Sequence, residues 1–180
     1  MPSLPPLADP ILLDAFPGGP FPTRIIAAAS ASVRADCHWH IAPVVTETVT
    51  VDGARSTLLL LPTLRVVSVA TVRVHVSGDV WLPIVDWRPA NAGMLYRPDG
   101  WLFGPASIQV TMTHGYEDTP VDLLPVIAAR CQRSTANSIL TQRSETVGTR
   151  TASESYNVNR LQIEAGANVL ANYRLPPRVA

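Results

Sequence analysis

The chain has 180 residues, of which 47% are hydrophobic, and a formal net charge of zero. These values allow one ordinary globular domain with an appendage, and they argue against a general nucleic-acid coat, which needs a basic surface. The longest apolar run, around residues 123–129, is far below the roughly 20 residues that cross a bilayer. No basic residue precedes Arg24, so we expect no secretory signal and no membrane attachment, and a protein made in a cytoplasm.

The charges are unevenly placed along the chain. Residues 77–125 hold six acidic residues and two arginines, whereas residues 126–180 hold three acidic residues and seven arginines. All 14 basic residues are arginines, which we attribute to genome composition. We expect the basic C-terminal stretch to bind an acidic partner. If the acidic stretch lined a DNA path, like-charge repulsion would let DNA slide.

Two helices are predicted before residue 40. Asp9 followed by Pro10 is typical of a helix start, and the Pro-Gly-Gly-Pro sequence at 17–20 ends this first helix. From Thr23 to about Cys37, apolar residues recur at helical spacing and form one stripe. The alanines beside that stripe favour close packing against another element.

The pattern then changes to alternation, which predicts a small antiparallel sheet of five or six strands with one apolar and one polar face. Residues 45–51 lead to Asp52-Gly53, a hairpin signal, and residues 57–61 supply the returning strand. Residues 72–76 and 80–86 predict a second hairpin, in which Pro83 marks an edge or a bulge. Strands at 94–97 and 108–112 complete the sheet.

A third helix is predicted after Tyr116, with Thr119-Pro120 at its start. Pro125 requires either that this helix begin later, near Leu124, or that it kink. Residues 134 to about 159 are rich in Ser, Thr, Asn and Arg and too poor in apolar side chains to form a core, so we expect an extended arm. A last short helix is predicted from Leu161 to about Tyr173.

The cysteines and histidines are the candidates for metal, catalytic or redox chemistry. Cys37, His38 and His40 are close in sequence, but their spacing does not match the paired ligands of a zinc site. His114 lies near acidic residues, yet no nucleophile motif accompanies it. Cys37 and Cys131 lie on apolar helical stripes and fit reduced, buried thiols. We therefore predict no catalytic residue, no metal, no cofactor and no enzymatic activity.

The tryptophans offer an alternative function. Trp81, Trp87 and Trp101 could form an aromatic platform for sugars or bases, as in a β-rich module that binds carbohydrate or protein. Tryptophans in a small sheet more often serve the core or a protein interface, which is the interpretation that we favour.

A family resemblance rests on several short stretches. These are Ala-Ser-Ala-Ser-Val-Arg at 29–34 with Trp-His-Ile-Ala-Pro at 39–43, Thr-His-Gly-Tyr at 113–116, Glu-Thr-Val-Gly at 145–148 and Asn-Tyr-Arg at 172–174. In this order they resemble the head-to-tail adaptor, or head-completion connector, proteins of long-tailed double-stranded DNA phages, especially those infecting actinobacteria. The resemblance extends from about Thr23 to Tyr173.

The resemblance implies a fold and an assembly. The implied fold class is α+β, a helical body with a small antiparallel β-sheet insertion and an extended C-terminal arm. The implied segments are an N-terminal extension at 1–22, an adaptor body at 23–133 and an arm with a short terminal helix at 134–180. The protein would form a twelvefold ring in the virion neck, between the portal and the stopper or tail-completion protein, with genomic DNA passing through its channel.

Aromatic and arginine side chains are typical of interface hot spots. We therefore expect the portal or subunit interface to use four residues of the sheet, Trp87, Arg88, Tyr96 and Arg97. From the arm we expect Arg143, Arg150, Tyr156, Arg160, Tyr173 and Arg174. The arm would be the principal assembly device, and its removal after Arg133 would leave the body folded.

Overall fold

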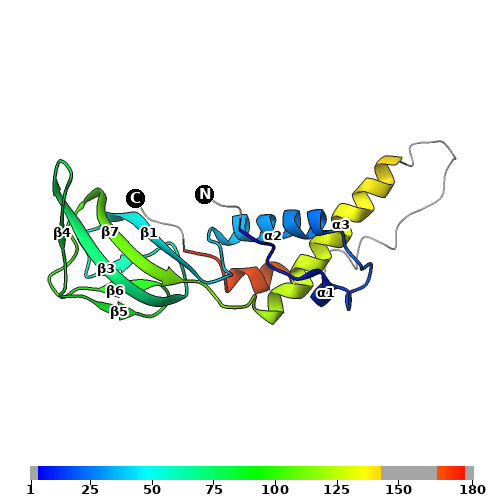
Figure 1. Cartoon of the computed structure of the whole chain (residues 1–180), viewed down its shortest axis with the longest axis horizontal. Helices are drawn as coiled ribbons and strands as arrows, with labels where there is room; N and C mark the ends of the chain where they lie inside the picture. The colour runs from blue at the N-terminus through cyan, green and yellow to red at the C-terminus, as the bar shows by residue number, and fades with distance from the viewer. Residues whose placement is uncertain (1–3, 143–165, 177–180) are drawn as a thin grey trace. The chain divides into compact units, whose positions relative to one another are not determined.

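The computed structural model describes residues 4–142 and 166–176, and the chain divides into two units. The described residues within Met1–His38 and Thr119–Arg174 belong to a helical unit, and those within Trp39–Asp118, together with Leu175 and Pro176, belong to a unit whose core elements are strands (Figure 1). The β unit is thus inserted in the sequence between two helices. The predicted segments 1–22, 23–133 and 134–180 do not coincide with these units, and they stay a prediction about the assembled protein.

The helical unit is built around two long helices, α2 (Thr23–Cys37) and α3 (Leu124–Gln142), which pack against each other. Their apolar stripes form a shared core, in which Ile26, Val33 and Ile127 are fully buried. The first stripe is the one that the helical spacing predicted. No helix among the described residues is long and apolar enough to cross a membrane.

Capping residues and prolines explain where the helices begin. The short helix α1 (Pro10–Leu13) follows Asp9, whose carboxylate accepts a hydrogen bond from the Ile11 backbone N–H at 2.9 Å, as predicted. A 3-10 turn, η1 (Val121–Leu123), leads into α3, and Pro125 is the second residue of α3. The alternative in which this helix begins near Leu124 is confirmed, because a proline in the first turn removes no helical hydrogen bond.

The described residues of the β unit form two antiparallel sheets. The larger sheet has the strand order β1-β7-β3-β4 and the smaller sheet has the order β2-β6-β5 (Figure 1). The strands are β1 (Val45–Gly53), β2 (Leu58–Leu60), β3 (Val66–Ser77), β4 (Val80–Pro83), β5 (Arg88–Ala90), β6 (Met94–Tyr96) and β7 (Gly104–His114).

The predicted hairpin between residues 45–51 and 57–61 is wrong. β1 pairs with β7 and β2 pairs with β6, so the chain crosses from the larger to the smaller sheet after Gly53. A Cβ atom at Gly53 would lie 1.7 Å from the Leu102 carbonyl oxygen, so this glycine allows two segments to approach closely instead of making a tight turn. The second predicted hairpin is confirmed, since β3 pairs with β4, and Pro83 lies in that edge strand.

The two sheets face each other across one hydrophobic core. Leu59 and Leu95 of the smaller sheet are buried in the same cluster as Val72, Val110 and Met112 of the larger sheet. This arrangement is a small β-sandwich, in which each sheet covers the apolar face of the other.

The outward face of the larger sheet is polar, as the alternation predicted. Thr46 pairs with Thr113 and Thr48 pairs with Thr111 across β1 and β7. The hydroxyl oxygens of these two pairs are 2.8 Å and 2.9 Å apart, so the threonines bond to each other. We call this surface the threonine face.

The predicted fold class, a helical body with a small antiparallel β-sheet insertion, is wrong. The β part is not a small insertion in a helical body but a second unit with its own core, and its strands β3 and β7 are 12 and 11 residues long. The alternation predicts a single sheet with one polar and one apolar face. In the structure the leucine run at 58–61 and residues 94–96 supply a second sheet that covers this face.

Candidate interaction surfaces

The structure brings together the four residues of the sheet that were expected at an interface. Arg88 and Tyr96 are paired across β5 and β6, and the Arg88 guanidinium carbon lies 4.7 Å from the centre of the Tyr96 ring. This is a cation–π contact on the outward face of the smaller sheet. Trp87, Arg88 and Tyr96 line one pocket together with Asp86, and Arg97 contacts that Asp86, so the four expected residues lie close together.

Hydrogen bonds hold this patch in place. The Arg97 Nε–H donates to both oxygens of the Asp86 carboxylate, at 3.0 and 3.1 Å, while its Nη1–H donates to the Gly100 carbonyl. The Trp87 indole N–H donates to the Ile84 carbonyl at 2.9 Å. Because the Arg97–Asp86 pair is partly exposed, it contributes at most about 1 kcal/mol to stability. Its main effect is to fix the side chains that surround a shallow pocket lined by Val85, Asp86, Trp87, Arg88, Tyr96 and Pro98.

Two leucines extend the patch along β2. Leu58 pairs with Tyr96, and Leu60 pairs with Met94, on the side of the sheet away from the core. Leu58 and Leu60 are 37% and 42% exposed, whereas Leu59 between them is buried. We call this surface, formed by Leu58, Leu60, Arg88, Met94 and Tyr96, the leucine–tyrosine face. An apolar outward face with arginine and tyrosine has the composition of a protein interface.

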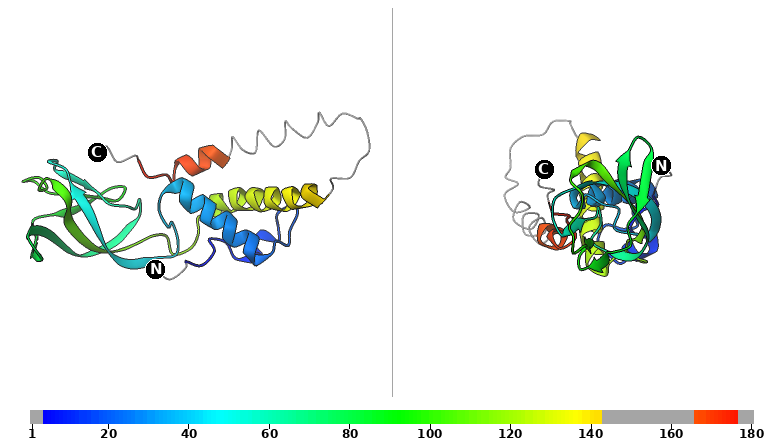
Figure 2. Two further views of the ribbon diagram at one scale, coloured as in Figure 1. Left: turned by 90° about the horizontal axis from the view of Figure 1, so that it is seen from above. Right: turned by 90° about the vertical axis from the view of Figure 1, so that its left-hand side faces the viewer.

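Of the expected arm residues, Tyr173 and Arg174 are described, and both contact the helical unit. Residues 166–171 are helical, and Leu170 is only 4% exposed (Figure 2). The Tyr173 hydroxyl donates to the Asp122 carboxylate at 2.8 Å, and the Arg174 Nε–H donates to the Asp36 carbonyl at 3.1 Å. The end of the arm is therefore attached to the helical unit. Four further expected residues lie outside the described residues: Arg143, Arg150, Tyr156 and Arg160.

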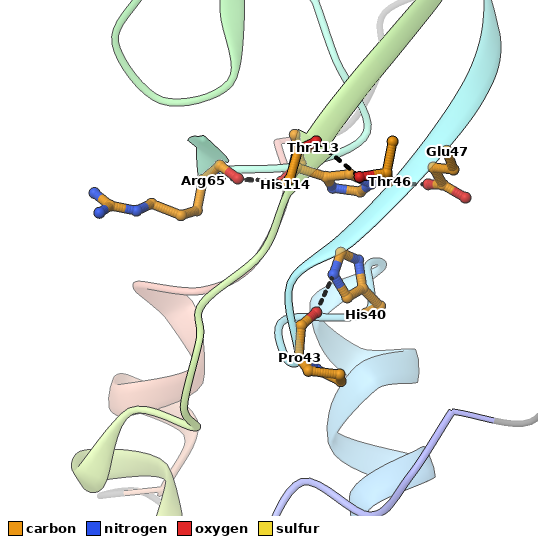
Figure 3. A network of polar contacts seen from close by, with 8 residues as sticks. His40, Pro43, Thr46, Glu47, Arg65, Thr113 and His114 are labelled. Carbon is orange, nitrogen blue, oxygen red and sulfur yellow. Dashed lines mark hydrogen bonds and ion pairs between the residues drawn. The ribbon is translucent and has the colours of Figure 1, made fainter. Parts of the chain in front are cut away.

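A histidine pair lies at one end of the sandwich, where β1 and β7 begin and end (Figure 3). His114 is 1% exposed, and its Nε2 lies 2.9 Å from Glu47 Oε1. The His40 ring stands at right angles to the His114 ring, with the ring centres 4.5 Å apart, and its Nε2–H donates to the Pro43 carbonyl. A Cβ atom at Gly115, whose φ is +110°, would lie 2.6 Å from His40 Nε2, so a glycine is needed beside this pair.

Burial controls the charge of both histidines. Desolvation lowers the pKa of His114, although the hydrogen bond and charge of Glu47 act in the opposite direction. Desolvation, followed by repulsion from His114, lowers the pKa of His40. The Nδ1 atom of His114 is buried and has no hydrogen-bond partner in the described part of the chain. The geometry thus favours a neutral His114 whose Nε2–H donates to Glu47.

This pair does not form a metal centre or a catalytic triad. Among the described residues, no group of three or more His, Cys, Asp or Glu side chains is placed to hold a metal ion. The hydroxyls of Thr46 and Thr113 bond to each other on the outward face, whereas His114 lies on the core side of the sheet. They therefore offer His114 no nucleophile.

The two cysteines are free thiols, as predicted. Cys37 and Cys131 are both completely buried in the helical unit. Burial, with a smaller contribution from Asp36, raises the pKa of Cys37 to about 11. Burial also raises the pKa of Cys131. Both thiols therefore stay protonated at neutral pH, which disfavours their reaction.

The three tryptophans do not form one platform. Trp101 is buried in the sandwich core, and Trp87 packs partly against the same core. Trp81 pairs with His75 across β3 and β4, with the two ring centres 5.1 Å apart. Because Trp101 points into the core, the carbohydrate-platform interpretation loses one of its three residues.

A β-sandwich with a preorganised apolar and aromatic outward face is typical of a protein that acts by contact with other macromolecules. Comparison with solved structures identifies chains with a similar fold. The fold is similar to a chain in the neck of a native GTA (gene transfer agent) particle computed with C12 symmetry, with a TM-score of 0.54 and 13% identity over 89% of this chain and 86% of that chain. It is also similar to a chain in the neck of an empty GTA particle computed with C6 symmetry, with a TM-score of 0.52 and 13% identity over 87% and 80% of the two chains.

These neighbours support the family resemblance at the level of the fold. They are structural components of a phage-like neck and not enzymes, and they do not support the narrower assignment to phages of actinobacteria. No protein-family model matches the chain, and no curated protein matches it in sequence.

Sequence reasoning missed the leucines of the leucine–tyrosine face. A signal was present, because Leu58-Leu59-Leu60-Leu61 is an uninterrupted apolar run, and such runs are typical of strands covered on both faces. In the structure only one face of β2 is covered.

Proposed function

We propose that this protein is a structural component of the neck of a phage-like particle, where it acts as an adaptor between the portal of the DNA-filled head and the stopper or tail. The observation that carries the proposal is the fold likeness to two neck chains, which extends over nearly nine-tenths of this chain and includes both units. A likeness confined to the sandwich would say much less, because small sandwiches serve many functions.

The proposed assembly is a ring of twelve copies. The symmetry of the native neck to which this fold is similar supports that number. Genomic DNA would pass through the channel without sequence-specific binding, and the chain would be made in the host cytoplasm before joining the virion. We propose the patch of Trp87, Arg88, Tyr96 and Arg97 as part of its interfaces, because these side chains are fixed before any partner binds.

Particle imaging tests this function. A short epitope tag inserted between Gly78 and Asp79, in an exposed hairpin turn, should be labelled by antibody at the junction of head and tail in purified particles. Disrupting the gene should yield packed heads and separate tails, and expressing the intact chain in trans should rejoin them. Label on the capsid shell or the tail tip, or normal particles without the gene product, would contradict the proposal.

A further inference from the structure

The β unit has two outward faces of opposite character. Antiparallel sheets with one covered face normally present polar side chains to water on the other face. The larger sheet follows this rule with its threonine face, whereas the smaller sheet presents the leucine–tyrosine face. Since both sheets belong to the same sandwich, the polarity of their two outward faces can be compared directly. The smaller sheet is therefore the one whose outward face needs a cover.

The two faces lie on opposite sides of the unit, because their sheets share one core between them. The threonine face is also suited to being covered. The Thr46–Thr113 and Thr48–Thr111 pairs satisfy much of each other's hydrogen bonding, so covering them costs less than covering charged groups would. Asp52 and Arg73 are both exposed on this outward side of the larger sheet, and the Asp52 carboxylate accepts the Ala106 backbone N–H at 2.7 Å. Their opposite charges leave this side without a net charge that would oppose the approach of another surface.

We infer that the leucine–tyrosine face of one copy docks on the threonine face of the next copy. This inference rests on the proposed function, in which many copies surround one axis. A contact between two different surfaces on opposite sides of a subunit repeats head to tail, and it closes into a ring when each step adds a rotation. If the leucine–tyrosine faces of two copies docked on each other instead, the contact would be symmetric and the assembly would end at a dimer.

Chemical crosslinking tests the contact directly in assembled particles. The full chain carrying both Leu60→Cys and Thr48→Cys, one on each face, should give a ladder of multimers with a short bismaleimide. Either substitution alone should give no ladder beyond a dimer, because each copy then offers one reactive thiol. The native Cys37 and Cys131 are completely buried, so the unsubstituted chain is the background control.

A charge exchange supplies the second test. Leu60→Glu should reduce assembly into necks by more than about tenfold, because it would bury an unpaired carboxylate against the next copy. Combining it with Thr48→Arg should restore assembly by providing a partner for that carboxylate. Val76→Glu is the matched control, since Val76 is exposed on β3 but belongs to neither face. All variants should retain the melting temperature of the unsubstituted chain, because each replaced side chain is exposed in the isolated chain.

The outcomes separate the inference from the proposed function. A ladder with the double cysteine variant and rescue by Thr48→Arg would support the inference. If the tagged chain is in the neck but neither result is obtained, the docking inference is overturned and the proposed function stands. If Leu60→Glu leaves the ring intact and releases a different neck protein, that protein covers the face and the inference is overturned. If the tagged chain is absent from the neck, the proposed function itself fails.

Discussion

Replacing Leu170 with alanine should destabilise the helical unit. Leu170 is 4% exposed in the helical segment 166–171, and a Cβ atom at Gly166 would lie in ordinary contact with Val126 of α3, so this segment packs on the helical core. Leu→Ala at a buried site costs about 2–5 kcal/mol. For a unit of this size, each kcal/mol lowers the melting temperature by about 4–8 °C. We therefore expect a fall of at least about 8 °C.

Hydrogen exchange combined with thermal melting measures this effect unit by unit. In Leu170→Ala, amides of α2 should exchange faster, while those of β7 in the other unit should be unchanged. Tyr173→Phe should show a smaller loss of about 1 kcal/mol, since it removes the hydroxyl that donates to Asp122 and keeps the ring. Val121→Ala is the control: Val121 is 78% exposed, and a change of less than about 0.5 kcal/mol is expected. A Leu170→Ala protein with unchanged melting and exchange would show that the arm is separable from the body, as the sequence predicted.

Three further predictions concern the β unit and the thiols. Gly115→Ala should destabilise the β unit by about 2–4 kcal/mol, because the new Cβ atom combines a strained backbone conformation with overlap on His40. Gly78→Ala, whose Cβ atom would lie in open space, should cost about 1 kcal/mol. Urea unfolding followed by tryptophan fluorescence compares the two variants. Folding lowers the pKa of His114, so on acidification the unfolded chain binds a proton before the folded chain does. The contribution of His114 to the free energy of unfolding should therefore be fully present above about pH 6.5 and be lost as the pH falls below that value. His114→Gln should flatten this acid slope, and an equal slope in both proteins would contradict the assignment. Non-reducing mass spectrometry of particles should find Cys37 and Cys131 as free thiols, and an intramolecular disulfide would refute this.

The helices and most strands could be predicted because their signals are local. Asp9 and Pro10 mark a helix start through capping, and Pro125 forces a late start through its missing N–H. The alternation at 108–112 marks β7. Such features depend on neighbours in sequence, so composition and spacing reveal them.

The pairing of strands could not be predicted in the same way. The Asp52-Gly53 pair has the same local chemistry in a hairpin turn and in a crossing between sheets, and only the approach of Leu102 decides between them. The second sheet depends on contacts between residues 58–60 and 94–96, far apart in sequence. Without it, the alternation predicts a single small sheet inserted in a helical body.

The candidate surfaces were predicted in part. Arg88 and Tyr96 were selected because of their residue types, and strand register then placed them opposite each other. Leu58 and Leu60 were passed over because an apolar side chain in a strand is ordinarily assigned to the core. For the arm, composition predicts a segment without a core of its own, whereas in the described residues 166–176 buried Leu170 and the contacts of Tyr173 and Arg174 attach its end to the helical unit.

The ends of the β unit lie beside each other, because Val45 at the start of β1 is paired with His114 at the end of β7. A segment whose ends are adjacent can be exchanged by recombination without altering the path of the flanking helices. The helical unit could therefore keep its own partners while unrelated sequences are substituted between His38 and Thr119. Chimeras that carry a foreign sandwich at this junction should fold, and evolution would be free to vary the two units at different rates.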